Sequence, residues 1–258
     1  MELEAFSQTD FDLALKRSIR SLTRGKTFST NPQAILLGGQ SGAGKTTIHR
    51  IKQKEFQGNI IIIDGDSYHS LHPNYLTLQE KYGKGSVDYT KDFAGKMVEH
   101  LVDELSKQGY HLLIEGTLRT TQVPRQTAQL LASKEYQVSL AVIGTKTELS
   151  YLSTLIRYEE LYTIDPNQAR ATPKELHDGI VEHLVDNLRE LEDACLFDQI
   201  QIYQRDRLCV YDSETDEGSA ADVLQECLFG KWSKVEEEML KVGQERLREM
   251  VKRSGNDV

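Results

Sequence analysis

The chain of 258 residues has few cysteines, no excess of basic residues and no long apolar run. Its three cysteines, Cys195, Cys209 and Cys227, are an odd number, and they form neither a CxxC pair nor a Cys/His cluster. A disulfide framework and a zinc site are therefore not indicated, and we expect free thiols in a reducing compartment.

The absence of long apolar runs and of an excess of basic residues argues against further classes of protein. No stretch approaches the roughly 20 apolar residues that a membrane-spanning helix requires. The N-terminal residues, MELEAFSQTDFD, lack the basic-then-apolar order of a signal peptide. We therefore expect a cytoplasmic protein that does not bind membranes. The formal net charge of -9 argues against a general nucleic-acid-binding protein, which needs a basic surface to displace counterions.

The pattern of apolar residues predicts the fold class. Strand-like apolar runs alternate with helix-like segments. The predicted strands are 34–39, 59–66, 111–117 and 136–144, followed by a final pair at 200–205 and 208–212. The predicted helices between them are 45–56, 90–106 and 124–132. Several of the runs are continuously apolar, as in strands buried on both faces of a parallel sheet. The sequence therefore predicts a doubly wound, mostly parallel α/β fold.

The two ends of the chain are predicted to be helical additions to a single domain that spans 1–258. Residues 10–24 have the apolar spacing of an amphipathic helix, so that 1–30 form an N-terminal helix and linker. Residues 220–258 form a charged C-terminal helical appendage, with a break expected at Gly230.

Two helices between these ends are predicted to begin with capping boxes. One opens with Thr145 and Glu148. The other opens with Thr172, Pro173 and Glu175, which places the proline at the first helical position. The segment between these two helices is therefore expected to be a loop.

The segment GGQSGAGKTT, residues 38–47, lies between the first strand and the next helix and has the pattern of a phosphate-binding loop. Its glycines let successive backbone N–H groups point at phosphate oxygens. Lys45 supplies positive charge to the β and γ phosphates, and Thr46 supplies a hydroxyl for Mg²⁺. We therefore predict that this loop binds ATP, through Gly39, Gln40, Ser41, Gly42, Ala43, Gly44, Lys45, Thr46 and Thr47.

Two carboxylates, Asp64 and Asp66, follow the second apolar run. Ligands bind at the carboxyl ends of strands in such sheets, so Asp66 is placed to take the proton from an attacking hydroxyl. Help of this kind is worth about 100- to 10,000-fold in rate. The alternative is that Asp66 caps the next turn or binds magnesium through water. Asp64 is expected to be structural or to support the site from behind the residues that touch the ligands.

The third strand and the later helices contribute further polar candidates. Glu115, Thr117 and Arg119 alternate at the end of the third strand, so at most some of them are expected to face the crevice. Such groups suit a polyhydroxyl or phosphorylated acceptor. Arg157 and Arg170 flank the predicted loop, where arginines stabilise phosphoryl transfer by about 10³- to 10⁵-fold. Surface ion pairs are the alternative role for these two arginines.

The ordered segments GGQSGAGKTT, IIIIDGDSYHSLHPNY, TKDFAGKMVE, LLIEGTLRT, STLIRYEELY and NQARATP resemble the zeta toxin family, the toxin halves of bacterial epsilon–zeta toxin–antitoxin pairs. The resemblance covers nearly the whole chain. It implies a P-loop kinase type of fold and an ATP- and Mg²⁺-dependent kinase that phosphorylates the 3′-hydroxyl of the sugar of UDP-N-acetylglucosamine, which blocks cell-wall precursor synthesis. It also implies an antitoxin partner in a heterotetramer of two toxin and two antitoxin chains.

The resemblance also assigns roles to residues. It makes Asp66 the base, and it makes a γ-phosphate clamp of Lys45, Arg157 and Arg170. The implied contacts to the UDP-sugar are Asp66, Glu99, Glu115, Thr117, Arg119 and Thr127. The chain departs from the family at Tyr68 and His69, where Phe and then Arg or Lys are usual; a mostly neutral His69 would weaken a phosphate contact there.

Two other functions stay open at the level of sequence. One is a P-loop kinase for another small hydroxyl acceptor, such as an antibiotic or a nucleoside. The other is a regulatory NTP-binding module that acts through its partners. A regulatory module would need a sensor of the γ-phosphate but no acceptor base at the position of Asp66.

Overall fold

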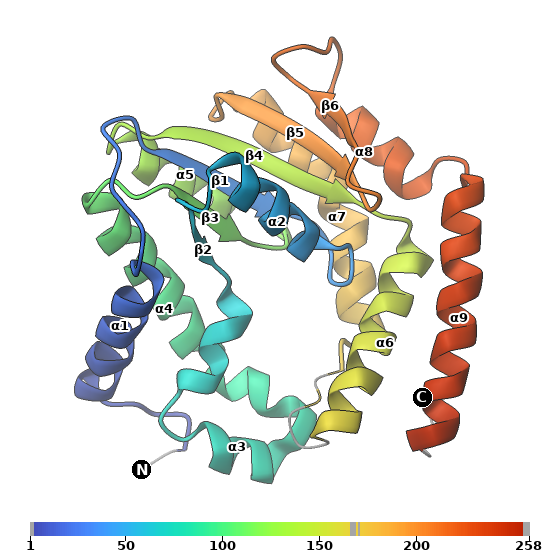
Figure 1. Cartoon of the computed structure of the whole chain (residues 1–258), viewed down its shortest axis with the longest axis horizontal. Helices are drawn as coiled ribbons and strands as arrows, with labels where there is room; N and C mark the ends of the chain where they lie inside the picture. The colour runs from blue at the N-terminus through green and yellow to red at the C-terminus, as the bar shows by residue number, and fades with distance from the viewer. Residues whose placement is uncertain (1–2, 166–168, 170, 255–258) are drawn as a thin grey trace.

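The computed structural model describes residues 3–165, 169 and 171–254. They form a six-stranded sheet in the order β2-β3-β1-β4-β5-β6 (Figure 1). Strands β1 to β5 are parallel, and β6 is antiparallel to β5. The strands are β1 (Gln33–Gly38), β2 (Ile61–Ile63), β3 (Leu112–Glu115), β4 (Gln137–Gly144), β5 (Gln199–Gln204) and β6 (Cys209–Asp212). The predicted mostly parallel α/β fold and its final strand pair are therefore confirmed.

Helices connect the strands and extend the chain at both ends. The helices are α1 (Gln8–Leu22), α2 (Lys45–Glu55), α3 (Tyr75–Tyr82), α4 (Ser86–Lys107), α5 (Gln122–Ala132), α6 (Thr147–Ile164), α7 (Lys174–Asp193), α8 (Ala220–Phe229) and α9 (Lys234–Ser254), with two 3₁₀ segments, η1 (Gly65–Leu71) and η2 (Gly83–Gly85). The break predicted at Gly230 is confirmed, because α8 ends at Phe229. No helix in the described ranges is long and apolar enough to span a membrane.

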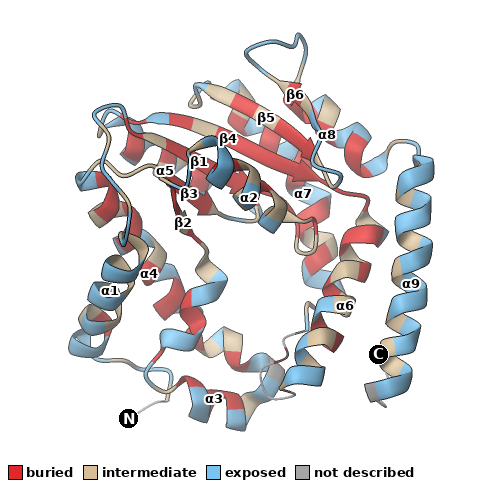
Figure 2. Ribbon diagram, in the orientation of Figure 1, coloured by how far each residue is buried: buried red, intermediate tan, exposed pale blue. Residues whose placement is uncertain are grey.

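Both faces of the sheet are buried, which explains the continuous apolar runs (Figure 2). Side chains alternate between the two faces along β1. Ile35 and Leu37 pack with Ile48 of α2 on one face. Ala34 and Leu36 belong to the larger core on the other face, together with residues of α4, α5, α7 and α8.

The strand order gathers the carboxyl ends of β1, β2, β3 and β4 at one edge of the sheet. From β1 the chain proceeds to β2 and β3 on one side and then returns to β4 on the other, so the order reverses beside β1. Crevices at such switch points are where ligands bind in open α/β sheets. Beyond this edge, η1 and α3 extend on one side and α6 on the other (Figure 1).

The last helix, α9, packs along α6 and not on the sheet (Figure 1). A Cβ atom on Gly243 would lie 2.7 Å from Cδ2 of Leu152, so the glycine permits the close approach of the two helices. Arg246 and Glu160 form an ion pair across the same contact. Helix α9 is therefore attached to the domain mainly through α6, whereas α8 belongs to the core that covers the sheet.

Both predicted capping boxes are wrong. The hydroxyl of Thr145 donates to the carbonyl oxygen of Ala43 at 2.9 Å, and α6 begins only at Thr147 without a side-chain cap. A tertiary contact with the loop after β1 has taken the place of the local cap. Helix α7 begins at Lys174 without a side-chain cap; Pro173, at ψ 138°, is the residue before the helix and not its first residue.

Candidate active site

The loop between β1 and α2 has the backbone that its glycines predict. Gly39, Gly42 and Gly44 have φ values of 143°, 74° and 106°, a region that glycine adopts without strain. A Cβ atom on Gly42 would lie 2.0 Å from the carbonyl oxygen of Ser150. The loop therefore needs glycine both for its turn and for its close contact with α6.

Lys45 lies at the centre of this loop. Its Nζ donates to the carbonyl oxygens of Gly39 at 2.8 Å and Gln40 at 3.3 Å, and lies 3.7 Å from Oε1 of Glu115. Burial lowers the pKa of Lys45, while the negative charges of Glu115 and Asp66 act in the opposite direction. A largely buried cation is thus held between the loop and the end of β3.

Glu115, the last residue of β3, contacts a second basic side chain. Its Oε2 lies 2.7 Å from Nε2 of His49 on α2. Burial acts to raise the pKa of Glu115, but His49 and Lys45 outweigh it, so the pKa lies below its ordinary value. His49 was not among the residues predicted from the sequence, although its i, i+4 spacing from Lys45 places the two on one face of α2.

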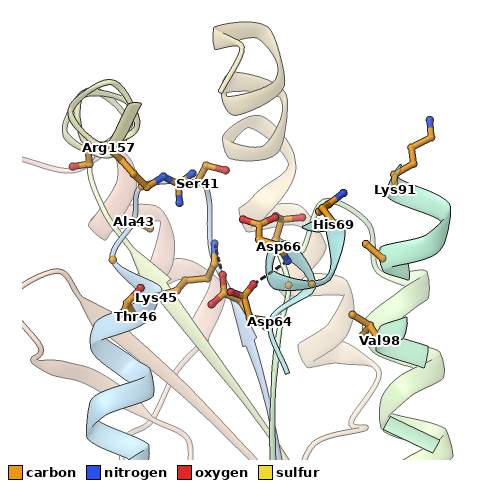
Figure 3. Close-up of a pocket in the computed structure, with 18 of the residues that line it drawn as sticks. Ser41, Ala43, Lys45, Thr46, Asp64, Asp66, His69, Lys91, Val98 and Arg157 are labelled. Atoms are coloured by element: carbon orange, nitrogen blue, oxygen red, sulfur yellow. Dashed lines mark hydrogen bonds and ion pairs between the residues drawn. The ribbon is translucent and has the colours of Figure 1, made fainter. Parts of the chain in front are cut away.

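The two carboxylates after β2, Asp64 and Asp66, have different surroundings. Asp64 accepts hydrogen bonds from the N–H of Asp66 and the hydroxyl of Ser67, both at 3.1 Å, and so caps η1. Asp64 is thus the structural residue that the sequence predicts. Burial, followed by the charges of Glu115 and Asp66, raises the pKa of Asp64. The side chain of Asp66 is exposed and lines a pocket beside Lys45 (Figure 3).

This phosphate-loop pocket has a volume of about 460 Å³. Ser41 to Thr46 line it, as do Asp66, Glu115 and Arg157. Figure 3 shows Lys45, Asp66 and Arg157 around the pocket on three different elements. Gln40, also expected to bind nucleotide, is 0% exposed, and its side chain donates to the carbonyl oxygen of Thr145 and to the hydroxyl of Ser150 on α6. Arg170 lies outside the described residues.

A second pocket of about 430 Å³, here called the lateral pocket, adjoins the first. Both are lined by Val98, Glu115, Gly116 and Thr117. Apolar side chains such as Leu36, Val102 and Leu130 form much of the lateral pocket. The two pockets together bring in every residue expected to contact an acceptor, namely Asp66, Glu99, Glu115, Thr117, Arg119 and Thr127.

The expectation that Glu115, Thr117 and Arg119 do not all face the crevice is wrong, because all three line the lateral pocket. Strand β3 ends at Glu115, so the alternation of a strand no longer applies to the two residues that follow. Leu118 has φ 53° and is buried, which turns the chain between Thr117 and Arg119.

Arg205 lines the phosphate-loop pocket and was not identified from the sequence. Its Nη1 donates to the carbonyl oxygen of Gly42 at 2.8 Å, and burial lowers the pKa of the guanidinium. Arg205 directly follows β5, so the rule that identified Asp66, a polar residue at the carboxyl end of a parallel strand, would have found it. Lys91 of α4 lines the same pocket.

The two departures from the family motif have different surroundings. Tyr68 is buried in the core, and burial raises its pKa. His69 also lines the phosphate-loop pocket, although its side chain is largely buried, and its Nδ1 lies 2.7 Å from Oγ1 of Thr90. His69 is therefore held by α4 at the wall of the pocket.

Comparisons with known sequences all point to one family. The model of the Zeta toxin family matches residues 18–216. The chain is 69% identical over 253 residues to Toxin PezT of Streptococcus pneumoniae, which covers 98% of this chain and 100% of PezT. It is 41% identical over 229 residues to Toxin zeta of Streptococcus pyogenes, which covers 88% of this chain and 80% of that protein.

Solved structures support the same relation. A structure of the PezAT chromosomal toxin–antitoxin system of Streptococcus pneumoniae has a TM-score of 0.91 and 65% identity, and the match covers 98% of this chain and 100% of that chain. A complex of AvrRxo1-ORF1 and AvrRxo1-ORF2 with ATP has a TM-score of 0.64 at 13% identity, covering 98% and 84%, and is similar in fold alone. The P-loop kinase type of fold predicted from the sequence is confirmed.

Proposed function

Because the chain belongs to the zeta toxin family, we propose that it is the toxin of a toxin–antitoxin pair and acts as an ATP-dependent kinase. The proposed reaction phosphorylates the 3′-hydroxyl of the sugar of UDP-N-acetylglucosamine and so blocks cell-wall precursor synthesis in the cytoplasm. The observation that carries this proposal is that the phosphate-loop pocket and the lateral pocket meet at Glu115 and Thr117, with Asp66 lining the first pocket.

ATP would occupy the phosphate-loop pocket. Its phosphates would accept from the backbone N–H groups of the loop, at the N-terminus of α2. Lys45, Arg157 and Arg170 would neutralise the charge that develops on the transferred group. The role of Arg170 rests on the sequence, whereas Lys45 and Arg157 line the pocket.

The oxygen donors around this pocket fit Mg²⁺, which prefers oxygen ligands and few protein contacts. The exposed hydroxyl of Thr46 and the carboxylates of Asp64 and Glu115 line the pocket. No group of three His, Cys, Asp or Glu residues suited to hold a metal occurs in the described part of the chain. Thr46 would therefore hold the ion jointly with phosphate oxygens, and the ion would supply charge neutralisation.

Asp66 would act as the base. Its carboxylate would take the proton of the acceptor hydroxyl while the hydroxyl oxygen forms a bond to the γ-phosphorus and the bond to ADP breaks. Because Asp64 caps η1, the carboxylate of Asp66 is not needed for that cap. Its exposure on the pocket wall supports the base role over the alternative of a turn cap.

The lateral pocket would hold the acceptor. Its apolar lining suits the flat faces of a base and a sugar, and its polar residues suit their oxygens. Arg119 would pair with the diphosphate, since arginine binds phosphate bidentately. Glu99, Thr117 and Thr127 would accept from or donate to hydroxyl and amide groups.

The partner and the domain organisation belong to the same proposal. We expect a cognate antitoxin, because the related solved structure is described as a toxin–antitoxin system. The complex of two toxin and two antitoxin chains is what the resemblance to the family implies. The chain would act as one domain over 1–258, with the N-terminal addition at 1–30 and the C-terminal addition at 220–258.

The proposal is tested by ADP release from purified protein with ATP and Mg²⁺. A panel of acceptors is added one at a time: UDP-N-acetylglucosamine, UDP-glucose, a nucleoside and an aminoglycoside. We expect release above the background only with the N-acetylated sugar nucleotide. Release that depends on a nucleoside or an aminoglycoside would replace this acceptor, and release that ignores every acceptor would contradict a kinase.

A further inference from the structure

Gln40 ties the phosphate loop to α6. Its side chain is fully buried, and Nε2 donates to the carbonyl oxygen of Thr145 at 2.6 Å and to Oγ of Ser150 at 3.3 Å. Within the described residues Oε1 of Gln40 has no hydrogen-bond partner. The two bonds made by Nε2 are therefore the ones that orient the side-chain amide. Thr145 in turn donates to the carbonyl oxygen of Ala43 at 2.9 Å. The loop is thus bonded to the start of α6 at two points.

A residue of α7 extends this connection. His177 is 0% exposed, and its Nε2 lies 2.9 Å from Oγ of Ser150. Its Nδ1 lies 3.1 Å from Oδ1 of Asp178. His177 lines neither the phosphate-loop pocket nor the lateral pocket. The buried polar chain from His177 through Ser150 to Gln40 therefore connects α7, α6 and the phosphate loop.

The same helix α6 carries side chains into the pocket. Ser153 and Arg157, one and two turns after Ser150, both line the phosphate-loop pocket. The backbone of Gly42 also rests directly on the carbonyl of Ser150, where an added Cβ atom would lie 2.0 Å away. The position of Arg157 relative to Lys45 is therefore set where the loop meets Ser150.

We propose that His177 is a positioning residue for phosphoryl transfer. By holding Ser150, it keeps α6 and its Arg157 in a fixed place relative to the phosphate loop. The inference rests on the proposed function, because it uses the role of Arg157 at the γ-phosphate. It assigns a catalytic consequence to a buried histidine that cannot touch the reactants.

The proposal predicts a specific kinetic result. His177→Asn removes the group at Nε2, and we expect kcat to fall about 10- to 100-fold, because a misplacement of about 1 Å costs on that order. The Kd for ATP should change by less than about threefold, because the N–H groups of the loop and Lys45 remain. His177→Gln, whose terminal amide comes near the position of Nε2, should restore most of the loss.

A double-mutant cycle tests the connection to Arg157. ADP formation and nucleotide affinity are measured for the full chain and for the His177→Asn, His177→Gln and Ser150→Ala variants, with His183→Asn, exposed on α7, as the control. The His177→Asn change is repeated in the Arg157→Ala background. If His177 acts through Arg157, its loss should cost less than about twofold there, since coupled residues are not additive.

An equal loss in both backgrounds would overturn the proposal, as would unchanged kcat in both His177→Asn and Ser150→Ala. If His177→Asn does not fold, Ser150→Ala removes the other partner with a smaller change of volume, and its own cycle with Arg157→Ala decides. Failure of the proposed function can be distinguished from failure of this inference. In that case the wild-type protein forms ADP but no phosphorylated sugar, and the variants are then compared by their rates of ADP formation alone.

Discussion

Asp64 and Asp66 are two carboxylates of the same type, two residues apart, with different environments. Asp64 is used by the backbone of η1, and burial raises its pKa. Asp66 is exposed on the pocket wall. The sequence predicts this division because Asp66 lies farther past the strand end. What decides it in the structure is the local hydrogen bonding, in which Asp64 and not Asp66 caps η1.

Lys45→Ala should weaken both ATP binding and transfer. The buried ammonium lies where the β and γ phosphates would accumulate negative charge, so we expect the Kd for ATP to rise at least about tenfold and transfer to fall about 100-fold or more. Isothermal titration and initial rates measure the two effects. Lys54→Ala, exposed on the same helix, should change neither. Unchanged ATP affinity in Lys45→Ala would contradict the role of this lysine.

His72 predicts a pH dependence of stability. Its Nδ1 accepts from the N–H of Asn74 at 3.1 Å, and its Nε2 donates to the carbonyl of Glu4 at 3.2 Å, which selects the neutral ring. Burial, partly offset by the Glu4 carbonyl, lowers its pKa from 6.5. Below pH 6.5 the unfolded chain therefore binds a proton at His72 more readily than the folded protein does. Stability from this group is complete above pH 6.5 and is lost as the pH falls.

Urea unfolding between pH 7.5 and 5 measures this effect. The free energy of unfolding of the wild type should fall more steeply on acidification than that of His72→Gln. The difference in slope should not exceed about 1.4 kcal/mol per pH unit, the limit for one proton. His183→Gln, at an exposed position of α7, should retain the wild-type slope. Equal slopes in wild type and His72→Gln would show that His72 does not resist protonation.

Individual site residues were predictable where their position in the chain alone places them. Lys45 and Thr46 follow from the loop pattern, and Asp66 and Glu115 follow from the ends of strands. His49 and the inward side chain of Gln40 were not predictable, because their roles depend on partners distant in sequence. Glu115 lies 66 positions after His49, so only the folded sheet brings this pair together.

At the scale of elements, periodicity predicted the strands and the longer helices, and Gly230 correctly marked a helix end, whereas the two predicted capping boxes failed. The side chain of Thr145, expected to cap α6, bonds to Ala43 of the phosphate loop instead. Segments η1 and α3 were not predicted, because 65–82 have no sustained apolar period. Tertiary contacts stabilise such short elements, as with Tyr68, which packs into the core.

The contact between α6 and α9 gives a prediction for Gly243→Leu. The larger side chain would collide with Leu152, since even a Cβ atom lies 2.7 Å from it. We expect a loss of about 1–3 kcal/mol, typical of overpacking, and faster tryptic cleavage within α9. Gln244→Leu, at an exposed neighbouring position, serves as the control. Equal cleavage and equal unfolding of the two variants would mean that α9 does not depend on this approach.

At the scale of the whole molecule, the net charge and the local charge differ. The chain carries a net charge of -9, yet Lys45, Lys91, Arg157 and Arg205 gather around one pocket. The composition argued against an extensive basic surface, but it could not show where these four basic residues gather. The order of the strands in the sheet could not be predicted from the sequence either, because it depends on long-range packing. That order places the phosphate-loop pocket beside the lateral pocket, which is the basis of the proposed transfer.

The central claim is that phosphate passes from ATP to a sugar nucleotide with Asp66 as base. Phosphorus NMR of purified protein with ATP, Mg²⁺ and UDP-N-acetylglucosamine tests it directly. We predict a new phosphomonoester resonance correlated with the proton on carbon 3 of the sugar, and a rate lower by about 100- to 10,000-fold in Asp66→Asn. Asp88→Asn, an exposed carboxylate on α4, should behave as wild type. ADP without a phosphorylated sugar, or an undiminished signal in Asp66→Asn, would contradict the account.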